Sequence, residues 1–239
     1  MARSPAPKKQ QRSPLMPFYL ILGVVALVGL GLLARQMMAG GGTAAKAPVP
    51  VTMDPAQLAQ VQGISVGRAD APVQIFEFAD FQCPGCGEFA RFVSPIIKER
   101  YVQAGTVRYV YYDFPLPMHP HAFLASRAAR CANEQGKFWE YHDVLYGRQS
   151  QWSPQRDATD SFIEYARDIQ GLDQGPFRDC VRSDRYAREV TENIKLGESL
   201  GVNGTPTVFI NGKRLPNVPG PKELDVLIQQ EVGAPTATE

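Results

Sequence analysis

Apolar residues follow a strand-like pattern in two places within the first half of this chain. Residues 73–78 form a short, mostly apolar run, and residues 106–112 are rich in β-branched and aromatic side chains, so both predict buried strands. The residues between them show helical spacing up to Tyr101, with a bend expected at Pro95 because proline removes a helical hydrogen bond. Such a strand–helix–strand unit predicts a parallel pair with a right-handed crossover.

The pattern becomes helical throughout the next part of the chain, from His119 to Gly201. Five stretches there have helical spacing and no strand pattern lies between them: residues 122–134, 137–146, 160–169, 176–182 and 185–200. The two strand-bearing parts of the chain are therefore expected to be separated by a helical block.

A hairpin and a terminal helix are predicted after this block. Residues 207–210 and 213–215 alternate as strands around Asn211-Gly212, which is typical of a type I′ turn. Residues 221–232 have the spacing of an amphipathic helix. Near the other end, Asp54 and Pro55 predict the start of a short helix.

A long uncharged stretch occupies the N-terminal part of the chain. Residues 15–34 contain no charged side chain, and as a helix they would span about 30 Å, the thickness of the hydrocarbon core of a bilayer. Four basic residues precede the stretch: Arg3, Lys8, Lys9 and Arg12. This charge bias predicts a cytoplasmic N-terminus at residues 1–14, a transmembrane anchor at 15–38 and an exported remainder.

A cleaved signal peptide is the alternative, because small residues follow the stretch, but the apolar segments of signal peptides are usually shorter. Either interpretation exports the bulk of the chain. The remaining boundaries predict a linker and short helix at 39–60, one domain at 61–233 with a helical insertion at about 118–201, and a tail at 234–239. Acidic and basic residues are interspersed in the exported part, which argues against nucleic acid as a partner.

Two cysteines separated by two residues lie directly after the first predicted strand. Cys83-Pro84-Gly85-Cys86 opens the following helix, and a helix N-terminus stabilises a thiolate through its free N–H groups and its dipole. Proline is tolerated in a first helical turn, and Cys86 is near enough to close a disulfide. This arrangement is typical of thiol–disulfide chemistry. A half zinc site and an incidental structural disulfide are the alternatives, although no second cysteine pair or histidine cluster has matching spacing.

Three ordered motifs give the chain a resemblance to a known family. They are EFADFQCPGC at residues 77–86, GKFW at 136–139 and GTPTVFING at 204–212. Over residues 61–232 the chain resembles the DsbA-like branch of the thioredoxin superfamily, in particular its membrane-anchored bacterial members of the BdbD type. The resemblance implies an α/β thioredoxin-like fold with an inserted helical subdomain, preceded here by the N-terminal transmembrane helix.

The resemblance also implies roles for residues around the cysteines. The Thr205–Pro206 bond would be cis and its loop would pack beside Cys83, where the Thr205 backbone could pair with a substrate; an ordinary trans proline is the alternative. Glu77 would be a buried acid with a raised pKa that accepts the proton of Cys86, the alternative being a solvated glutamate on the strand. Gly85 stands where strongly oxidising relatives often carry histidine, which predicts a weaker oxidant.

The other cysteines and the histidines are interpreted structurally. Cys131 and Cys180 both fall in the helical block and are expected to form a structural disulfide, rather than two free thiols or a second redox relay. His119 and His121 are expected in caps or loops. No metal or cofactor is expected.

These features together predict a membrane-tethered thiol:disulfide oxidoreductase that introduces disulfides into exported proteins with free cysteines. The resemblance implies reoxidation by a quinone-linked membrane partner of the DsbB or vitamin K epoxide reductase type. A disulfide reductase or isomerase, for example in cytochrome maturation, is one alternative. A non-catalytic peptide-binding module is the other, and a Cys-to-Ser pair at 83 and 86 would distinguish it.

Overall fold

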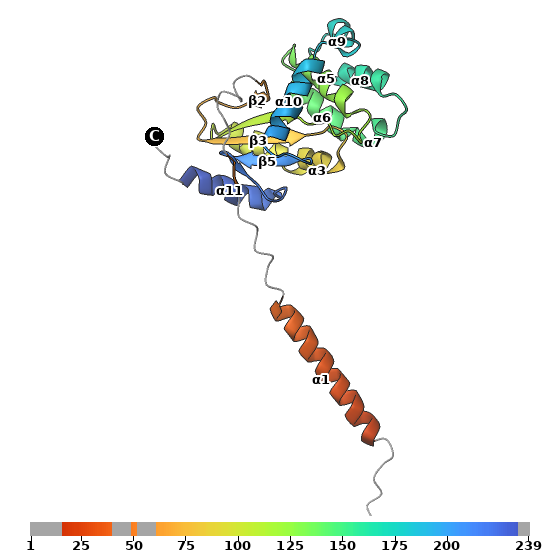
Figure 1. Ribbon diagram of the computed structural model, residues 1–239, viewed down its shortest axis with the longest axis vertical. Helices are drawn as coiled ribbons and strands as arrows, with labels where there is room; N and C mark the ends of the chain where they lie inside the picture. The colour runs from red at the N-terminus through yellow and green to blue at the C-terminus, as the bar shows by residue number, and fades with distance from the viewer. Residues whose placement is uncertain (1–15, 40–48, 52–60, 234–239) are drawn as a thin grey trace, which may run out of the picture. The chain divides into compact units, whose positions relative to one another are not determined.

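The computed structural model describes residues 16–39, 49–51 and 61–233, and the chain divides into two units at residues 46 and 47. The first unit contains helix α1 (Met16–Ala39), which covers most of the segment predicted to be an anchor (Figure 1). Among the described residues, no helix has both the length and the apolar character needed to cross a membrane. The short helix predicted at residues 54–59 lies outside the described residues.

The second unit is built around one sheet, whose described strands run in the order β1-β6-β5-β3-β4-β2. β3 and β4 are parallel, and every other neighbouring pair is antiparallel. The strands are β1 (Val49–Pro50), β2 (Ile64–Val66), β3 (Val73–Ala79), β4 (Val107–Asp113), β5 (Thr207–Ile210) and β6 (Lys213–Arg214). The predicted strands and the parallel pair are confirmed, whereas β1 and β2 were not predicted.

The hairpin between β5 and β6 turns as its sequence indicates. Asn211 has a φ of 47° and Gly212 a φ of 77°, the two positive values that a type I′ turn requires. The Asn211 side chain also accepts a hydrogen bond from the Gln74 N–H at 2.8 Å, which ties the turn to β3.

The helices of this unit agree with most of the predicted stretches. They are α3 (Pro84–Phe92), α4 (Ser94–Ile96), the π-helix η1 (Ile97–Val102), α5 (Ala122–Asn133), α6 (Phe138–Gly147), α7 (Gln149–Trp152), α8 (Thr159–Tyr165), the 3₁₀-helix η2 (Ala166–Asp168), α9 (Gln174–Val181), α10 (Ala187–Ser199) and α11 (Pro221–Gly233). The expectation of one helix bent at Pro95 was wrong in detail. The helix stops at Phe92 and restarts at Ser94, so Pro95 lies in a new first turn where its missing N–H costs little.

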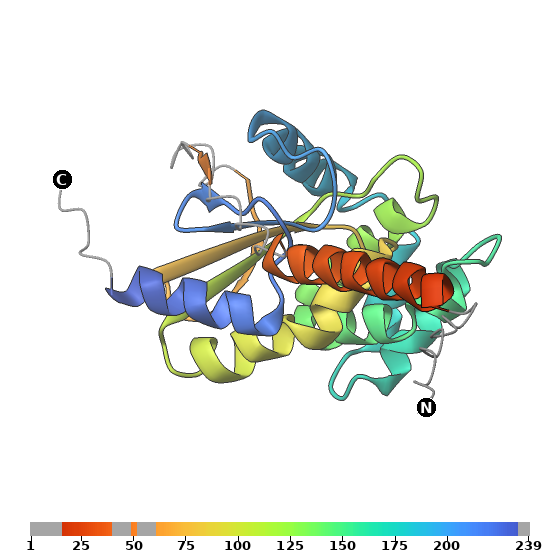
Figure 2. The ribbon, with the colours of Figure 1, turned by 90° about the horizontal axis from the view of Figure 1, so that it is seen from below.

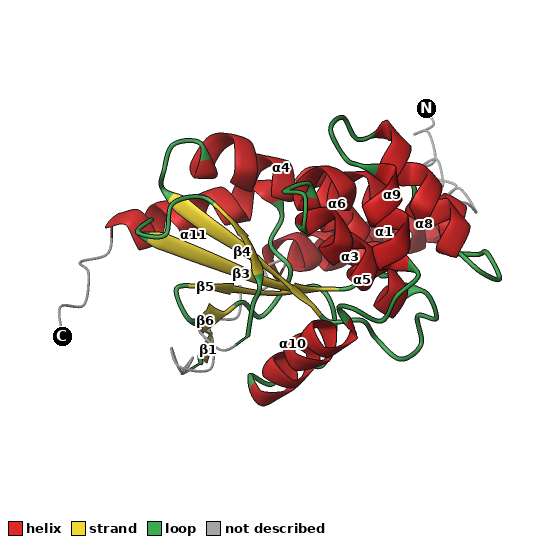
Figure 3. Ribbon diagram, turned by 90° about the horizontal axis from the view of Figure 1, so that it is seen from above, coloured by secondary structure: helices red, strands yellow, loops and turns green. Residues whose placement is uncertain are grey.

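Helices cover both faces of the sheet (Figure 3). On one face α10 packs through Leu196 and Leu200 against a cluster that includes Phe78 and Phe209. On the other face α3, η1 and α11 bury a second cluster that includes Val73, Ile75 and Ile210. Figure 2 shows α11 running beside the α4–η1 segment, and Arg100 of η1 pairs with Asp225 of α11 at 2.6 Å.

The helical insert joins the sheet through a buried ion pair. Arg130 of α5 donates to Asp113 of β4 at 2.5 Å and to the Asn193 side chain of α10 at 2.9 Å. Arg130 and Asp113 are almost completely buried, so each charge depends on the other for compensation.

Together, the sheet order, the helices on both faces and the insert make up the α/β thioredoxin-like fold with a helical insert that the sequence predicted.

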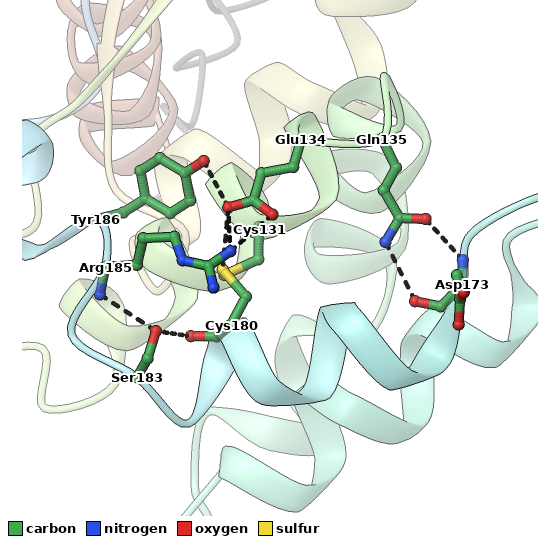
Figure 4. The surroundings of a disulfide bond; sticks show 8 residues. All are labelled: Cys131, Glu134, Gln135, Asp173, Cys180, Ser183, Arg185 and Tyr186. Carbon is green, nitrogen blue, oxygen red and sulfur yellow. Dashed lines mark hydrogen bonds and ion pairs between the residues drawn. A yellow bond between two sulfur atoms is a disulfide. The ribbon is translucent and has the colours of Figure 1, made fainter.

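A disulfide links Cys131 of α5 to Cys180 of α9 within the insert (Figure 4). Glu134, one turn after Cys131, accepts hydrogen bonds from Arg185 and Tyr186 at 2.7 and 2.8 Å. The next residue, Gln135, bonds both the N–H and the carbonyl of Asp173. The C-terminal end of α5 thus holds both ends of the α9 segment.

Candidate active site

The two cysteines lie where β3 ends and α3 begins. Cys83 is the N-cap of α3, with an extended backbone (φ −71°, ψ 123°), and Pro84 opens the helix. The Cys83 carbonyl accepts the first helical hydrogen bond from the Gly87 N–H at 3.1 Å. The free N–H groups of the first turn therefore face the Cys83 sulfur.

Cys83 is a strongly acidic thiol in this position. Its pKa is lowered to about 5, first by the hydrogen bond from the Cys86 thiol, and also by the Thr205 hydroxyl and the N–H groups of Cys86 and Gly85, while burial opposes the shift. As a thiol, Cys83 donates to the Thr205 carbonyl at 3.3 Å. Only 8% of the residue is exposed, so the sulfur is reached from one side.

Cys86 has the opposite chemistry. It is fully buried, and burial, followed by the influence of Cys83 and Glu77, raises its pKa well above that of a free thiol. The Asp80 N–H donates to its sulfur at 3.4 Å. One cysteine is thus suited to be a thiolate at neutral pH, and the other needs a base before it can act as one.

The loop containing Pro206 closes one side of the site. The Thr205–Pro206 peptide bond is cis. A Cβ atom placed on Gly85 would lie 3.4 Å from Pro206 and 3.8 Å from the Cys83 sulfur, so the CPGC turn and this loop are in van der Waals contact. The Thr205 carbonyl is therefore held next to the reactive sulfur.

Two hollows adjoin this contact. One, of about 320 Å³, is formed mainly by α3 and the loop that leads into α11; its lining includes Gly85, Phe89, Phe92 and Val218. The other, of about 370 Å³, contains Thr205, Pro206 and again Val218. Phe92 and Val218 are exposed apolar side chains, so the surface beside Cys83 can receive an apolar segment of a partner.

Glu77 is buried in β3, only 2% exposed, and is not the solvated glutamate of the alternative interpretation. Burial raises its pKa to about 8, although a hydrogen bond from Tyr109 and the charge of Lys98 oppose this. The Tyr109 hydroxyl donates to Glu77 Oε2. The charge of Glu77 is in turn one of the causes, after burial and Cys83, that raise the pKa of Cys86.

Gln149 of α7 is a site residue that the sequence did not suggest. Its side-chain amide donates to the carbonyls of Phe81 and Cys83, both at 2.8 Å. It also packs on Gly87, where an added Cβ would lie only 2.7 Å from Gln149 Oε1. The shape of the cysteine turn is therefore supported from the insert.

A second set of polar contacts fixes the residues just before the cysteines. The fully buried Asp80 accepts hydrogen bonds from the N–H groups of Gln82 and Leu116 and contacts His119 Nδ1 at 2.7 Å. His121 is the N-cap residue of α5, and its N–H donates to the Gln82 side chain at 2.8 Å. These two histidines lie in the loop and cap positions that were predicted.

The remaining predicted residues lie apart from the two reactive cysteines. Cys131 and Cys180 are paired with each other in the insert. Phe138 is buried in the core, with Trp139 packed against it. Across residues 16–39, 49–51 and 61–233, no group of three or more His, Cys, Asp or Glu side chains is arranged to hold a metal ion.

The architecture and the paired cysteines define a thioredoxin-like protein with a dithiol site. The family model described as thioredoxin matches residues 59–230, which is most of the chain. The chain belongs to the thioredoxin family, and the likeness to its DsbA-like members is confirmed.

Similar proteins include both disulfide-forming proteins and much longer chains. "Na(+)/H(+) antiporter NhaA 3" of Salinispora tropica is 38% identical over 149 residues, which cover 62% of this chain but only 21% of the antiporter. "Probable disulfide bond formation protein D" of Bacillus cereus is 28% identical over 62% of this chain and 69% of its own length. The crystal structure of oxidised BdbD from Bacillus subtilis has the same fold, with a TM-score of 0.67 at 20% identity, and the match covers 79% of this chain and 100% of the solved chain.

Proposed function

We propose that the protein is a thiol:disulfide oxidoreductase that transfers the Cys83–Cys86 disulfide to other proteins. The observation that carries this proposal is the placement of the two cysteines in one helix turn: Cys83 is the N-cap of α3 beside the cis Thr205–Pro206 bond, and Cys86 is fully buried. This placement lowers the pKa of Cys83 to about 5 and raises that of Cys86 well above its usual range. A cysteine of low pKa is both a reactive thiolate and a good leaving group, which disulfide exchange needs in turn.

Transfer to a substrate proceeds in two exchanges. A substrate thiolate attacks the Cys83 sulfur, the bond between Cys83 and Cys86 breaks, and Cys86 leaves as a thiolate that takes a proton from Glu77. A second substrate thiolate then attacks the substrate sulfur of the mixed disulfide, and Cys83 leaves as a stable thiolate. The substrate has lost two electrons to the enzyme, which is now a dithiol.

Extended segments with free cysteines are the substrates that this surface fits. The Thr205 carbonyl, 3.3 Å from the Cys83 sulfur in the free protein, can accept a hydrogen bond from a substrate backbone N–H. The exposed apolar side chains of Phe92 and Val218 would receive neighbouring substrate residues. Such contacts recognise the substrate backbone more than its side chains, which suits an enzyme with many substrates.

The site of action that we propose is the extracytoplasmic face of a membrane, with α1 as a single-pass anchor and residues 1–14 in the cytoplasm. The supporting observations are the charge bias of the sequence and the exposed apolar side chains of α1, such as Leu27 and Leu30, each 73% exposed. The substrates would be exported proteins. A quinone-linked membrane partner would reoxidise the dithiol, and tethering would raise its effective concentration.

The equilibrium reduction potential of the Cys83–Cys86 pair tests the direction of transfer. We expect a value near or above about −180 mV in titrations against glutathione, as for proteins that donate disulfides. A value near about −270 mV would instead indicate a reductase. The matched control is the double variant C83S/C86S, which must lose transfer to a reduced model substrate; retained activity would indicate the peptide-binding alternative.

A further inference from the structure

The buried carboxyl of Glu77 lies among side chains that the sequence did not connect to it. On the α3 side of the sheet, Tyr109 of β4 donates its hydroxyl hydrogen bond to Glu77 Oε2. Both residues are essentially inaccessible to solvent. A phenol that donates to a buried carboxylate stabilises its charged form, because no water is available to do so.

Lys98 supplies a positive charge to the same region. The restart of the helix at Ser94 and the π-helical turn that follows place Lys98 against α6, where its Nζ bonds both carboxylate oxygens of Asp143 at 2.9 and 2.8 Å. The ammonium also lies 5.4 Å from the centre of the Trp139 ring, which packs against Tyr109 at a tilt of 33°, with ring centres 5.0 Å apart. Its side chain is only 18% exposed, so solvent screens its charge little.

Lys98 is the cation that acts on the pKa of Glu77. The groups that act on it or respond to it are Cys83 and Cys86 from α3, Tyr109 and Tyr111 from β4, Tyr146 from α6, and Lys98 from η1, with Asp143 and His142 of α6 beyond Lys98. Tyr109 and Lys98 are the two that favour the carboxylate.

We propose that Tyr109 and Lys98 are positioning residues for Glu77, which together keep it able to exchange a proton with Cys86 near neutral pH. The inference rests on the proposed function, in which Cys86 takes a proton from Glu77 as it leaves the disulfide. The same proton transfer runs in reverse when Cys86 resolves a mixed disulfide at Cys83. Glu77 then takes the proton of Cys86, the Cys86 thiolate attacks the Cys83 sulfur, and the bound thiol leaves as a thiolate. Glu77 finally releases its proton to solvent.

Tyr109→Phe tests the hydrogen bond in the full-length protein. The reduced enzyme is mixed with 5,5′-dithiobis(2-nitrobenzoate), and release of the second thionitrobenzoate reports attack by Cys86. We expect resolution at pH 7 to slow by roughly tenfold or more, the effect of losing one hydrogen bond to a carboxylate. The rise of the rate with pH should move to higher pH, so that the deficit narrows in alkaline solution.

Tyr112→Phe is the matched control, because Tyr112 lies on the same strand but stacks on Phe78 at the opposite face. Lys98→Met should shift the pH profile in the same direction as Tyr109→Phe, and Lys98→Arg should restore it. These substitutions at a partly exposed site also keep the test decisive if Tyr109→Phe folds poorly. Profiles of Tyr109→Phe and Lys98→Met that superimpose on the wild type would overturn the inference.

The titration of Glu77 itself separates this inference from the proposed function. Carbon-13 NMR of glutamate carboxyls, assigned with Glu77→Gln, should show a higher pKa for Glu77 in Tyr109→Phe and Lys98→Met than in the wild type. An enzyme that fails to oxidise any substrate, yet shows these shifts, would contradict only the proposed function. Normal substrate oxidation with an unshifted Glu77 would contradict only the positioning role.

Discussion

Two groups of Thr205 act on Cys83, one through a hydrogen bond to its thiol and one through its pKa. Its carbonyl accepts the thiol hydrogen of Cys83, and its buried hydroxyl, which has no hydrogen-bond partner in the described residues, can donate to the thiolate. The hydroxyl is one of the groups that lower the pKa of Cys83 to about 5. A glycine at position 85 therefore does not leave the thiolate without side-chain donors, because Thr205 and Cys86 supply them.

Thr205→Val should raise the pKa of Cys83, because valine keeps the shape of threonine but removes the donor. Since the folded pKa lies below the reference value of 9.0, Cys83 stabilises the reduced form increasingly as pH rises from about 5 towards 9. In the variant, the same stabilisation of the reduced form should be reached only at a higher pH. Its reduced form should therefore be less stable, which makes the variant a stronger reductant. Ultraviolet thiolate absorbance against pH measures the shift, with Thr191→Val in α10 as control. An unchanged titration would contradict this role of the hydroxyl.

At the scale of elements, the site depends on a helix of only four residues. α7 carries Gln149, whose amide satisfies two carbonyls of the cysteine turn. Gln149→Leu should remove the amide donor from both buried carbonyls, of which only that of Cys83 keeps a second one, the Gly87 N–H, and should lower the free energy of unfolding by about 1–3 kcal/mol. Gln151→Leu, on the exposed side of the same helix, should change it far less. Urea unfolding of both variants makes the measurement; equal losses would mean that Gln149 acts only through packing.

The sequence predicted elements in proportion to their length and regularity. β3 and β4 have seven residues each and nearly every position is buried, so their apolar runs could be recognised in the sequence. β2 has three residues and α7 has four, too few for a period to be recognised. The π-helix was missed because its residues fit an α-helical pattern equally well.

The residues of the candidate site also fall into those that were predicted from the sequence and those that were not. The cysteines, Glu77 and the Thr205–Pro206 loop were predicted because they belong to contiguous motifs. Tyr109 and Gln149 were not, since their partners lie 32 and 66 residues away in the sequence. A tyrosine among other aromatic residues in a strand, or a glutamine in a polar loop, carries no local sign of a distant partner.

At the scale of the whole molecule, the helical insert is bound to the sheet by an ion pair and is crosslinked internally by a disulfide. Arg130 and Asp113 connect α5 to β4, and the adjacent Cys131 connects α5 to α9. None of the groups that set the pKa of Cys83 belongs to α5 or α9. The disulfide of the insert should therefore stabilise the fold without tuning the redox site.

The double variant C131A/C180A tests this separation. The bond spans 49 residues in sequence, and constraining a loop of that length in the unfolded chain stabilises the folded state by about 4 kcal/mol in the loop-entropy model. We expect a loss of up to that size in guanidinium unfolding, with the potential of the Cys83–Cys86 pair unchanged because the Arg130–Asp113 pair still holds α5 on the sheet. C83A/C86A is the matched control, which keeps the structural disulfide. A shifted potential in C131A/C180A would show instead that the insert transmits strain to the active site.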